Sequence, residues 1–204
     1  MSPRLSRAEQ NDRNRALLLS AALRVFLSRG YHAATLEQIA DEAGFSKGAV
    51  YSRFESKADM FLALLTDRIA ARAAENAAAV AELASSESMI ELAWQAERAM
   101  PGWRLLVTEF RVLAARDPAL NRRYAAAHAT TVNAAAGIVS AVAERDGVTL
   151  AVPARQLAEL FLAIETGIAL EQLASPDAID IRQAGAVLRQ LVELASPPAV
   201  AARK

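Results

Sequence analysis

The stretch that decides the fold runs from residue 35 to residue 57 and reads TLEQIADEAGFSKGAVYSRFESK. Thr35 is followed three residues later by a glutamine, the spacing of a capping box, which predicts a helix that begins after Thr35. Gly44 ends this helix, because glycine readily takes the left-handed conformation found after a last helical turn. Ser46 is an N-cap residue for another helix over residues 47–54. Two short helices joined by a tight turn predict a helix-turn-helix.

The flanking sequence adds a helix on each side of this pair. Upstream, residues 12–29 carry apolar side chains at helical spacing, and Gly30 then ends the helix. Downstream, Ser56 begins a long helix that meets no glycine or proline before Pro101. Further helices are expected at about 87–100, 102–116, 118–145, 154–174 and 180–195. No sustained apolar and polar alternation indicates a strand, so the sequence predicts an all-α fold.

The residues of this region resemble the tetracycline-repressor (TetR) family. The resemblance rests on Thr35, Ile39-Ala40, the run 43–54 and Ser56-Lys57, with residues 21–26, Gly30 and Tyr31 upstream. It implies an N-terminal three-helix helix-turn-helix DNA-binding domain followed by a larger helical effector-binding and dimerisation domain. We place the first domain at 1–57, with a flexible basic leader over 1–11, the second at 58–196, and a frayed tail at 197–204.

The resemblance also assigns roles to residues of the DNA-binding domain. Lys47, at the start of the recognition helix, is expected to read a guanine edge, with Ala49 near a thymine methyl group and Ser52 near either strand. Thr35, Tyr51 and Lys57 match positions that hold phosphates. The complete expected DNA-binding set is Thr35, Ser46, Lys47, Gly48, Ala49, Tyr51, Ser52, Arg53 and Lys57.

Three features of this set have two interpretations. Gly48 lies opposite Val50 on the predicted helix, where the lack of a side chain suits close approach to DNA, although a first-turn glycine is also tolerated without such a reason. Arg53 is either a phosphate contact or a solvated helix charge. The arginines of the leader region either reach the minor groove or are part of a solvated tail: Arg4, Arg7, Arg13 and Arg15.

The resemblance places a small-molecule pocket among the middle helices, and the sequence suggests aromatic walls with a few polar groups. The candidates are Trp94, Trp103, Phe110, Tyr124, His128, Phe161 and Glu165. Glu109 and Arg111 are expected to be surface charges. The mixture of side chains favours a small, largely apolar effector, but each residue is also a candidate for plain core.

The resemblance implies dimerisation through the last two helices, and each of these helices carries an apolar stripe. The expected contacts are Leu157, Ile164, Ile168, Leu188, Leu191 and Val192. Two such helices from each subunit would form a four-helix bundle across a two-fold axis. The alternative is that both stripes face only the core of their own subunit.

Composition limits the other classes of function. The absence of cysteine excludes disulfides and thiolate metal sites, and the two histidines and the lack of a glycine-rich phosphate loop favour no enzyme, no metal and no cofactor. Net charge is zero overall, but residues 1–57 hold nine Lys/Arg and six Asp/Glu and so form a mildly basic head. We expect charges to interrupt every long apolar stretch, which indicates a cytoplasmic protein without a signal peptide or membrane partner.

These observations predict a ligand-responsive, sequence-specific regulator of transcription that binds double-stranded operator DNA as a homodimer. A repressor that is released from its operator by an unidentified small-molecule effector is expected, although an activator would have the same sequence features. The alternative is a helical small-molecule-binding protein or enzyme with a vestigial helix-turn-helix.

Overall fold

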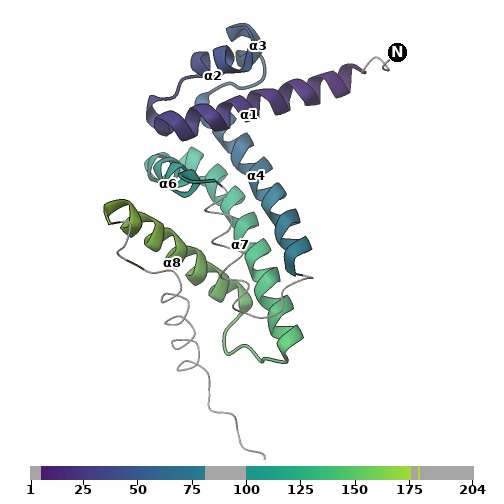
Figure 1. Cartoon of the computed structure of the whole chain (residues 1–204), viewed down its shortest axis with the longest axis vertical. Helices are drawn as coiled ribbons and strands as arrows, with labels where there is room; N and C mark the ends of the chain where they lie inside the picture. The colour runs from purple at the N-terminus through teal and green to yellow at the C-terminus, as the bar shows by residue number, and fades with distance from the viewer. Residues whose placement is uncertain (1–5, 81–99, 176–178, 180–204) are drawn as a thin grey trace, which may run out of the picture. The chain divides into compact units, whose positions relative to one another are not determined.

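The computed structural model describes residues 6–80, 100–175 and 179, and every regular element within these ranges is a helix. The helices are α1 (Arg7–Ala33), α2 (Leu36–Ala43), α3 (Lys47–Tyr51), α4 (Lys57–Val80), α6 (Trp103–Ala114), α7 (Pro118–Asp146) and α8 (Ala154–Ala174) (Figure 1). The expected all-α fold is confirmed. The helix expected over 180–195, the tail from 197 and nearly all of the helix expected over 87–100 lie outside the described residues.

The chain divides into two compact units. The first combines Met1–Ala71 with Gly102–His128, and the second combines Arg72–Pro101 with Ala129–Lys204. This division differs from the boundary expected after residue 57, because α6 and the beginning of α7 pack with the N-terminal helices.

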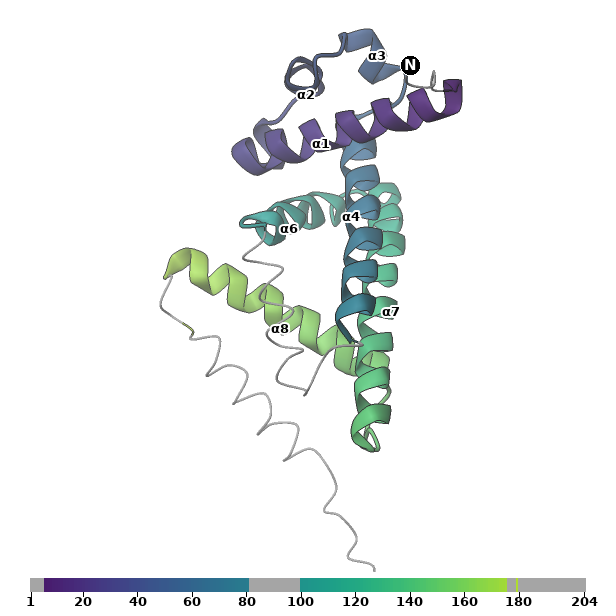
Figure 2. The same ribbon diagram turned by 45° about the vertical axis from the view of Figure 1, so that its right-hand side comes forward.

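An aromatic cluster accounts for this packing in the first unit. Its members are Phe26, Tyr31, Phe61, Trp103, Phe110 and Tyr124. The rings of Phe61 and Phe110 stack with centroids 4.3 Å apart, and Tyr31 meets both edge-on at 5.4 and 5.1 Å. Burial of each such ring stabilises the fold by about 1.5–3 kcal/mol. The helices α1, α4, α6 and α7 therefore share one core, with α6 lying against α1 (Figure 2).

The first helix begins earlier than the sequence pattern suggested. The Ser6 hydroxyl accepts the Glu9 backbone N–H at 3.2 Å, and the Glu9 carboxylate accepts the Ser6 N–H at 2.7 Å. This capping box starts α1 at Arg7, so a helix start at residue 12 and a flexible leader over the whole of 1–11 are wrong. A serine followed three residues later by glutamate was the available signal.

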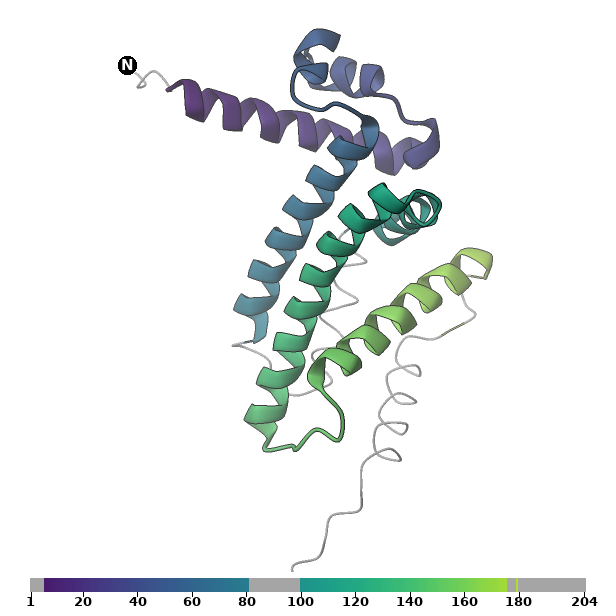
Figure 3. The same ribbon diagram turned by 180° about the vertical axis from the view of Figure 1, so that it is seen from behind.

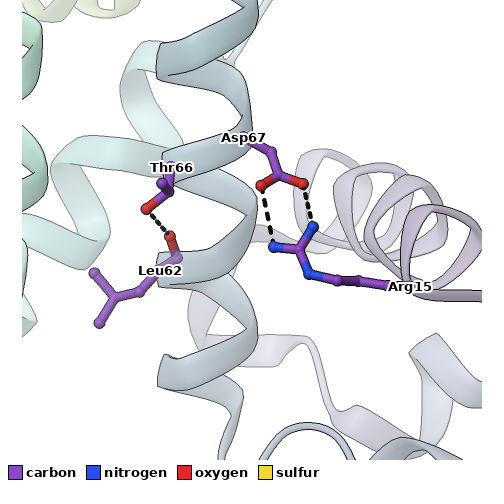
Figure 4. Close-up of polar contacts among 4 residues, drawn as sticks. All are labelled: Arg15, Leu62, Thr66 and Asp67. Atoms are coloured by element: carbon purple, nitrogen blue, oxygen red, sulfur yellow. Dashed lines mark hydrogen bonds and ion pairs between the residues drawn. The ribbon is translucent and has the colours of Figure 1, made fainter. Parts of the chain in front are cut away.

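One arginine of the expected leader group has a structural partner instead of a free side chain. The Arg15 guanidinium donates to both carboxylate oxygens of Asp67 on α4, at 2.7 and 3.0 Å (Figure 4). On the residue before Asp67, the Thr66 hydroxyl donates to the Leu62 carbonyl one turn back in α4 at 2.9 Å (Figure 4). The bidentate pair ties α1 to α4, so Arg15 is not available as part of a mobile arm.

The predicted break at Gly30 is confirmed as a kink within α1. Gly30 has φ 75° and ψ 167°, after which the chain makes one further turn to Ala33. A Cβ at Gly30 would also lie 3.1 Å from a carboxylate oxygen of Glu109. The positive φ therefore favours glycine at this position, and an added Cβ would also crowd the Glu109 carboxylate.

The two helices of the predicted helix-turn-helix are capped as expected. The Thr35 hydroxyl accepts the Gln38 N–H, the Gln38 side chain accepts the Thr35 N–H, and Gly44 is left-handed with φ 71°. Ser46 caps α3, but this helix ends at Tyr51 instead of Phe54. The difference arises because the Arg53 N–H bonds to the carbonyl three residues back, which tightens the last turn.

In the second unit, the end of α7 leads through residues 147–153 into α8 (Figure 3). Arg155 at the start of α8 donates to Asn133 of α7 at 2.6 Å. Ala158, Glu165 and Ile168 are the buried residues of α8. Its exposed side chains include Leu160, Leu170 and Leu173.

Helix α7 contradicts the expectation that charges interrupt every long apolar stretch. Residues 124–143 contain no Asp, Glu, Lys or Arg. By length and composition alone, α7 is the one helix of the described ranges that could cross a membrane. A single helix of this kind is weak evidence for a membrane span, because core helices of soluble proteins have the same features.

Replacing Gly30 by alanine should lower the free energy of unfolding by about 2 kcal/mol, because φ is positive and Glu109 blocks the new methyl group. Gly48→Ala is the matched control, since nothing lies within 4 Å of its added Cβ. The control should leave stability unchanged or raise it by up to about 1 kcal/mol. Urea denaturation followed by circular dichroism measures both, and equal stability of Gly30→Ala and wild type would contradict the kink.

Candidate nucleic-acid interface

The recognition helix α3 has one buried and one exposed side. Val50 is fully buried and Phe54 is nearly so, and both pack into the core of the first unit. Lys47, Gly48 and Ser52 are exposed. The predicted division of this segment into a core face and a small, polar outer face is therefore found in the structure.

The outer face is open to an approaching surface. Nothing lies within 4 Å of a Cβ placed on Gly48. The Lys47 ammonium makes no hydrogen bond or ion pair with any residue of the described ranges. A free ammonium at the start of a helix, beside a glycine, can reach into a groove without first breaking a contact within the protein.

Hydroxyl groups stand at the beginning of both helices of the motif. The Thr35 hydroxyl accepts the Gln38 N–H at 3.2 Å, and the Ser46 hydroxyl accepts the Ala49 N–H at 3.3 Å. A hydroxyl that accepts one bond still has its own hydrogen to donate. Thr35 and Ser46 are therefore able to cap their helices and donate to a phosphate oxygen at the same time.

Tyr51 has an acidic partner that the sequence analysis missed. Its hydroxyl, on a half-exposed side chain, donates to the Glu37 carboxylate of α2 at 2.9 Å. This bond raises the pKa of Tyr51. Hydrogen bonds from the Glu37 backbone N–H and then from Tyr51 lower the pKa of Glu37, and Lys47 adds to the shift. The signal in the sequence was a carboxylate in the first turn of α2, beside the recognition helix.

Arg53 also has partners within the chain. Its guanidinium donates to the Asn11 side chain of α1 at 2.6 Å and to the Ala49 carbonyl at 3.3 Å. The Ser52 hydroxyl donates to the same Ala49 carbonyl at 3.0 Å. Arg53 therefore ties α3 to α1. It is neither a free phosphate ligand nor a solvated charge, the two interpretations that the sequence allowed.

The Lys57 side chain binds groups within the protein, whereas a phosphate contact was expected. Its ammonium donates to the carbonyls of Tyr31, His32 and Ala34 at 2.6, 3.0 and 2.8 Å. An ammonium has three N–H donors, so all of them have an acceptor. A phosphate contact would require that one of these bonds break.

The surroundings of Lys57 reinforce this internal role. The ammonium lies 4.6 Å from the centroid of the Tyr31 ring. Burial lowers the pKa of Lys57 and, together with nearby Asp59, raises the pKa of Tyr31 to about 12. The neutral aromatic ring thus faces a partly buried cation.

The expected effector residues fall into separate groups. Trp103, Phe110, Tyr124 and His128 belong to the first unit, where ring contacts connect them in a series that includes Phe61. Phe110 has no exposed surface, so in this structure it is a core residue. Phe161 and the buried Glu165 belong to α8 in the second unit, and Trp94 lies outside the described residues. No group of three metal-ligating side chains occurs among the residues that the structure describes.

The expected dimer residues on α8 do not form its exposed side. Ile168 is buried, and Leu157 and Ile164 are partly buried. The exposed stripe consists of Leu160, Ala163, Gly167 and Leu170, whose spacing of three, four and three residues places them on one face. Leu188, Leu191 and Val192 lie outside the described residues.

Two capped helices, a left-handed glycine turn and an outward face with a free lysine define a helix-turn-helix DNA-binding domain. Residues 18–64 match the family model described as bacterial regulatory proteins, tetR family. The matched residues run from within α1 through α2 and α3 into α4, so they contain the whole helix-turn-helix.

Known proteins match the two parts of the chain to different degrees. The HTH-type transcriptional activator FasR of Mycolicibacterium smegmatis is 52% identical over 54 residues, which cover 26% of this chain and 25% of FasR. The HTH-type transcriptional repressor BepR of Brucella suis is 44% identical over 62 residues, 30% of this chain and 29% of BepR. The chain thus aligns with little more than a quarter of these relatives.

Similarity of fold extends over much more of the chain. The crystal structure of the transcriptional regulator FadR from Bacillus subtilis in complex with stearoyl-CoA has a TM-score of 0.61. The match covers 87% of this chain and 97% of FadR at 16% identity. At this identity the comparison shows a shared fold.

Lys57→Met should lower the free energy of unfolding by about 2 kcal/mol, because hydrogen bonds to charged groups contribute about 1.5–3 kcal/mol. Lys47→Met, which breaks no such bond, is the control and should unfold like the wild type. Urea denaturation measures both variants. A Lys57→Met protein with wild-type stability and a shallower salt dependence of DNA binding would instead support the phosphate contact.

Proposed function

We propose that this protein is a homodimeric, sequence-specific DNA-binding regulator of transcription whose operator affinity responds to a small molecule. The observation that carries the proposal is the exposed face of α3, with an unengaged lysine beside a glycine that leaves open space. A helix of this kind fits the major groove, which is wide enough to admit it. The match of residues 18–64 to the tetR family model supports the same function.

Within this proposal, base recognition falls to the beginning of α3. Lys47 is suited to a guanine edge, which presents two acceptors in the major groove. Ala49 and Ser52 contribute apolar and polar contacts, and Gly48 permits close approach. Phosphates are held by the hydroxyls of Thr35 and Ser46 and, once its bond to Glu37 is exchanged, by Tyr51.

Two helix-turn-helix domains must act together to read two half-sites. Half-sites one helical turn apart lie about 34–36 Å from each other, so a dimer has to fix this separation. We assign the dimer contact on α8 to the stripe Leu160, Ala163, Gly167 and Leu170. Its small residues allow a partner helix to approach closely, and its exposed leucines would be buried in the contact.

The effector is proposed to be a small, largely apolar molecule. The aromatic side chains of α6 and α7 supply apolar surface, and a regulator of similar fold has been solved with stearoyl-CoA. The effector acts by binding better to the conformation that does not bind DNA. We propose that the protein represses transcription and is released from DNA by the effector. Of the relatives, one is named an activator and another a repressor.

A helical binding protein or enzyme with a vestigial helix-turn-helix is the second candidate. Selection of duplexes from random DNA by the full-length protein separates the two. Enrichment of one sequence with two-fold symmetry supports the regulator, and recovery of DNA without enrichment would rule it out.

Lys47→Ala should weaken binding to the enriched duplex by about 1–3 kcal/mol, while binding to a scrambled duplex changes less. The reason is that a base contact carries sequence discrimination, whereas a phosphate contact weakens all binding equally. Arg116→Ala in the exposed turn that follows α6 removes the same charge and serves as the control. Fluorescence anisotropy on both duplexes measures the ratio, and equal loss on both would contradict base reading by Lys47.

Leu160→Glu should convert the dimer to a monomer, because it places a charge in an apolar contact. Val148→Glu is a matched control, since Val148 is 57% exposed and Leu160 is 58% exposed but only Leu160 belongs to the stripe. Multi-angle light scattering measures the mass of each variant. A dimeric Leu160→Glu protein, or loss of the dimer in both variants, would contradict this assignment.

A further inference from the structure

The single turn that follows the kink in α1 is held at its start by a carboxylate from another helix. Glu109 of α6 accepts the backbone N–H of Tyr31 at 2.8 Å. The same carboxylate lies over Gly30, where an added Cβ would be 3.1 Å from one of its oxygens. The expectation that Glu109 is a surface charge is therefore wrong, because its partner is 78 residues away in the sequence.

The end of this turn is held by the opposite charge. Lys57 of α4 donates to the carbonyls of Tyr31, His32 and Ala34. A carboxylate at the free N–H groups and an ammonium at the free carbonyls are the placements that a helical turn favours. The turn is thus fixed between α6 and α4 by side chains of opposite charge.

This turn leads directly into the helix-turn-helix. Ala34, whose carbonyl bonds to Lys57, precedes Thr35, which caps α2. A displacement of α6 that moved the Glu109 carboxylate would pull on the Tyr31 N–H, only four residues before Thr35. Between them, the carbonyls of His32 and Ala34 are held by the Lys57 ammonium, which limits how far this segment can absorb the movement.

We propose that Glu109 is a positioning residue that couples the packing of α6 to the DNA-binding state of the helix-turn-helix. This inference rests on the proposed function. Because coupling between two sites is reciprocal, DNA binding must in turn change the environment of α6. No effector needs to be known to test it.

Trp103 provides the measurement at the other end of α6. It is the first residue of this helix, and its ring stacks on Phe61 with centroids 6.2 Å apart. The chain has two tryptophans, so Trp94→Phe leaves the emission of Trp103 alone. The probe is the duplex enriched from random DNA by the wild-type protein.

In the Trp94→Phe background, saturation with this duplex should change the emission of Trp103. Adding Glu109→Ala should remove more than half of this change, and Glu109→Gln, which keeps an oxygen acceptor, should preserve more than half. Glu42→Ala is the control, because it removes a carboxylate that binds Arg24 of α1 at 2.7 Å without involving α6. Anisotropy confirms that each variant is saturated, and circular dichroism confirms that it is folded.

Three results would overturn the coupling. These are a duplex that binds without changing Trp103 emission, a Glu109→Ala protein that keeps more than half of the change, and a Glu42→Ala protein that loses as much as Glu109→Ala. If Glu109→Ala does not fold, Glu109→Met, which also removes the oxygen acceptor but keeps a long side chain, takes its place. This variant should lose more than half of the change, and a Glu109→Met protein that keeps more than half overturns the coupling. If no duplex is enriched from random DNA, the proposed function itself fails, and the coupling fails with it.

Discussion

The placement of the helix-turn-helix depends on the ammonium of Lys57, which donates to two backbone carbonyls in the last turn of α1 and to that of Ala34, between α1 and α2. Without it, the last carbonyls of the α1 turn would be left partly buried next to the aromatic core, where unpaired polar groups are expensive. The same ammonium faces the ring of Tyr31, which belongs to that core. The Lys57 side chain at the start of α4 thus connects α4 to the segment that leads from α1 into α2.

The elements of the motif itself were predictable because their determinants are local. The Thr35 capping box, the left-handed Gly44 and the Ser46 cap each involve residues at most four apart, and each is present as expected. The sequence contained the same kind of signal at Ser6, but a flexible leader was expected there instead of a helix start. The helix expected over 154–174 has those bounds in the structure, since proline and the apolar pattern mark its limits.

The side-chain partners that position the motif were not predictable in this way. Lys57, Arg53 and Glu109 look like surface charges in the sequence, and each binds a group that is distant along the chain. On α8, an apolar pattern could not reveal which stripe the protein itself buries. Ile168 therefore became a dimer candidate although it is buried, and the exposed small residues Ala163 and Gly167 were overlooked.

If the outer face of the helix-turn-helix recognises DNA, bound DNA must cover it. Hydrogen–deuterium exchange of the full-length protein, with and without the enriched duplex, measures this directly. The duplex should protect backbone amides over residues 35–53, with a weaker effect on the turn around Tyr31. Bound duplex that leaves residues 35–53 unprotected, or that protects only other parts of the chain, would contradict it.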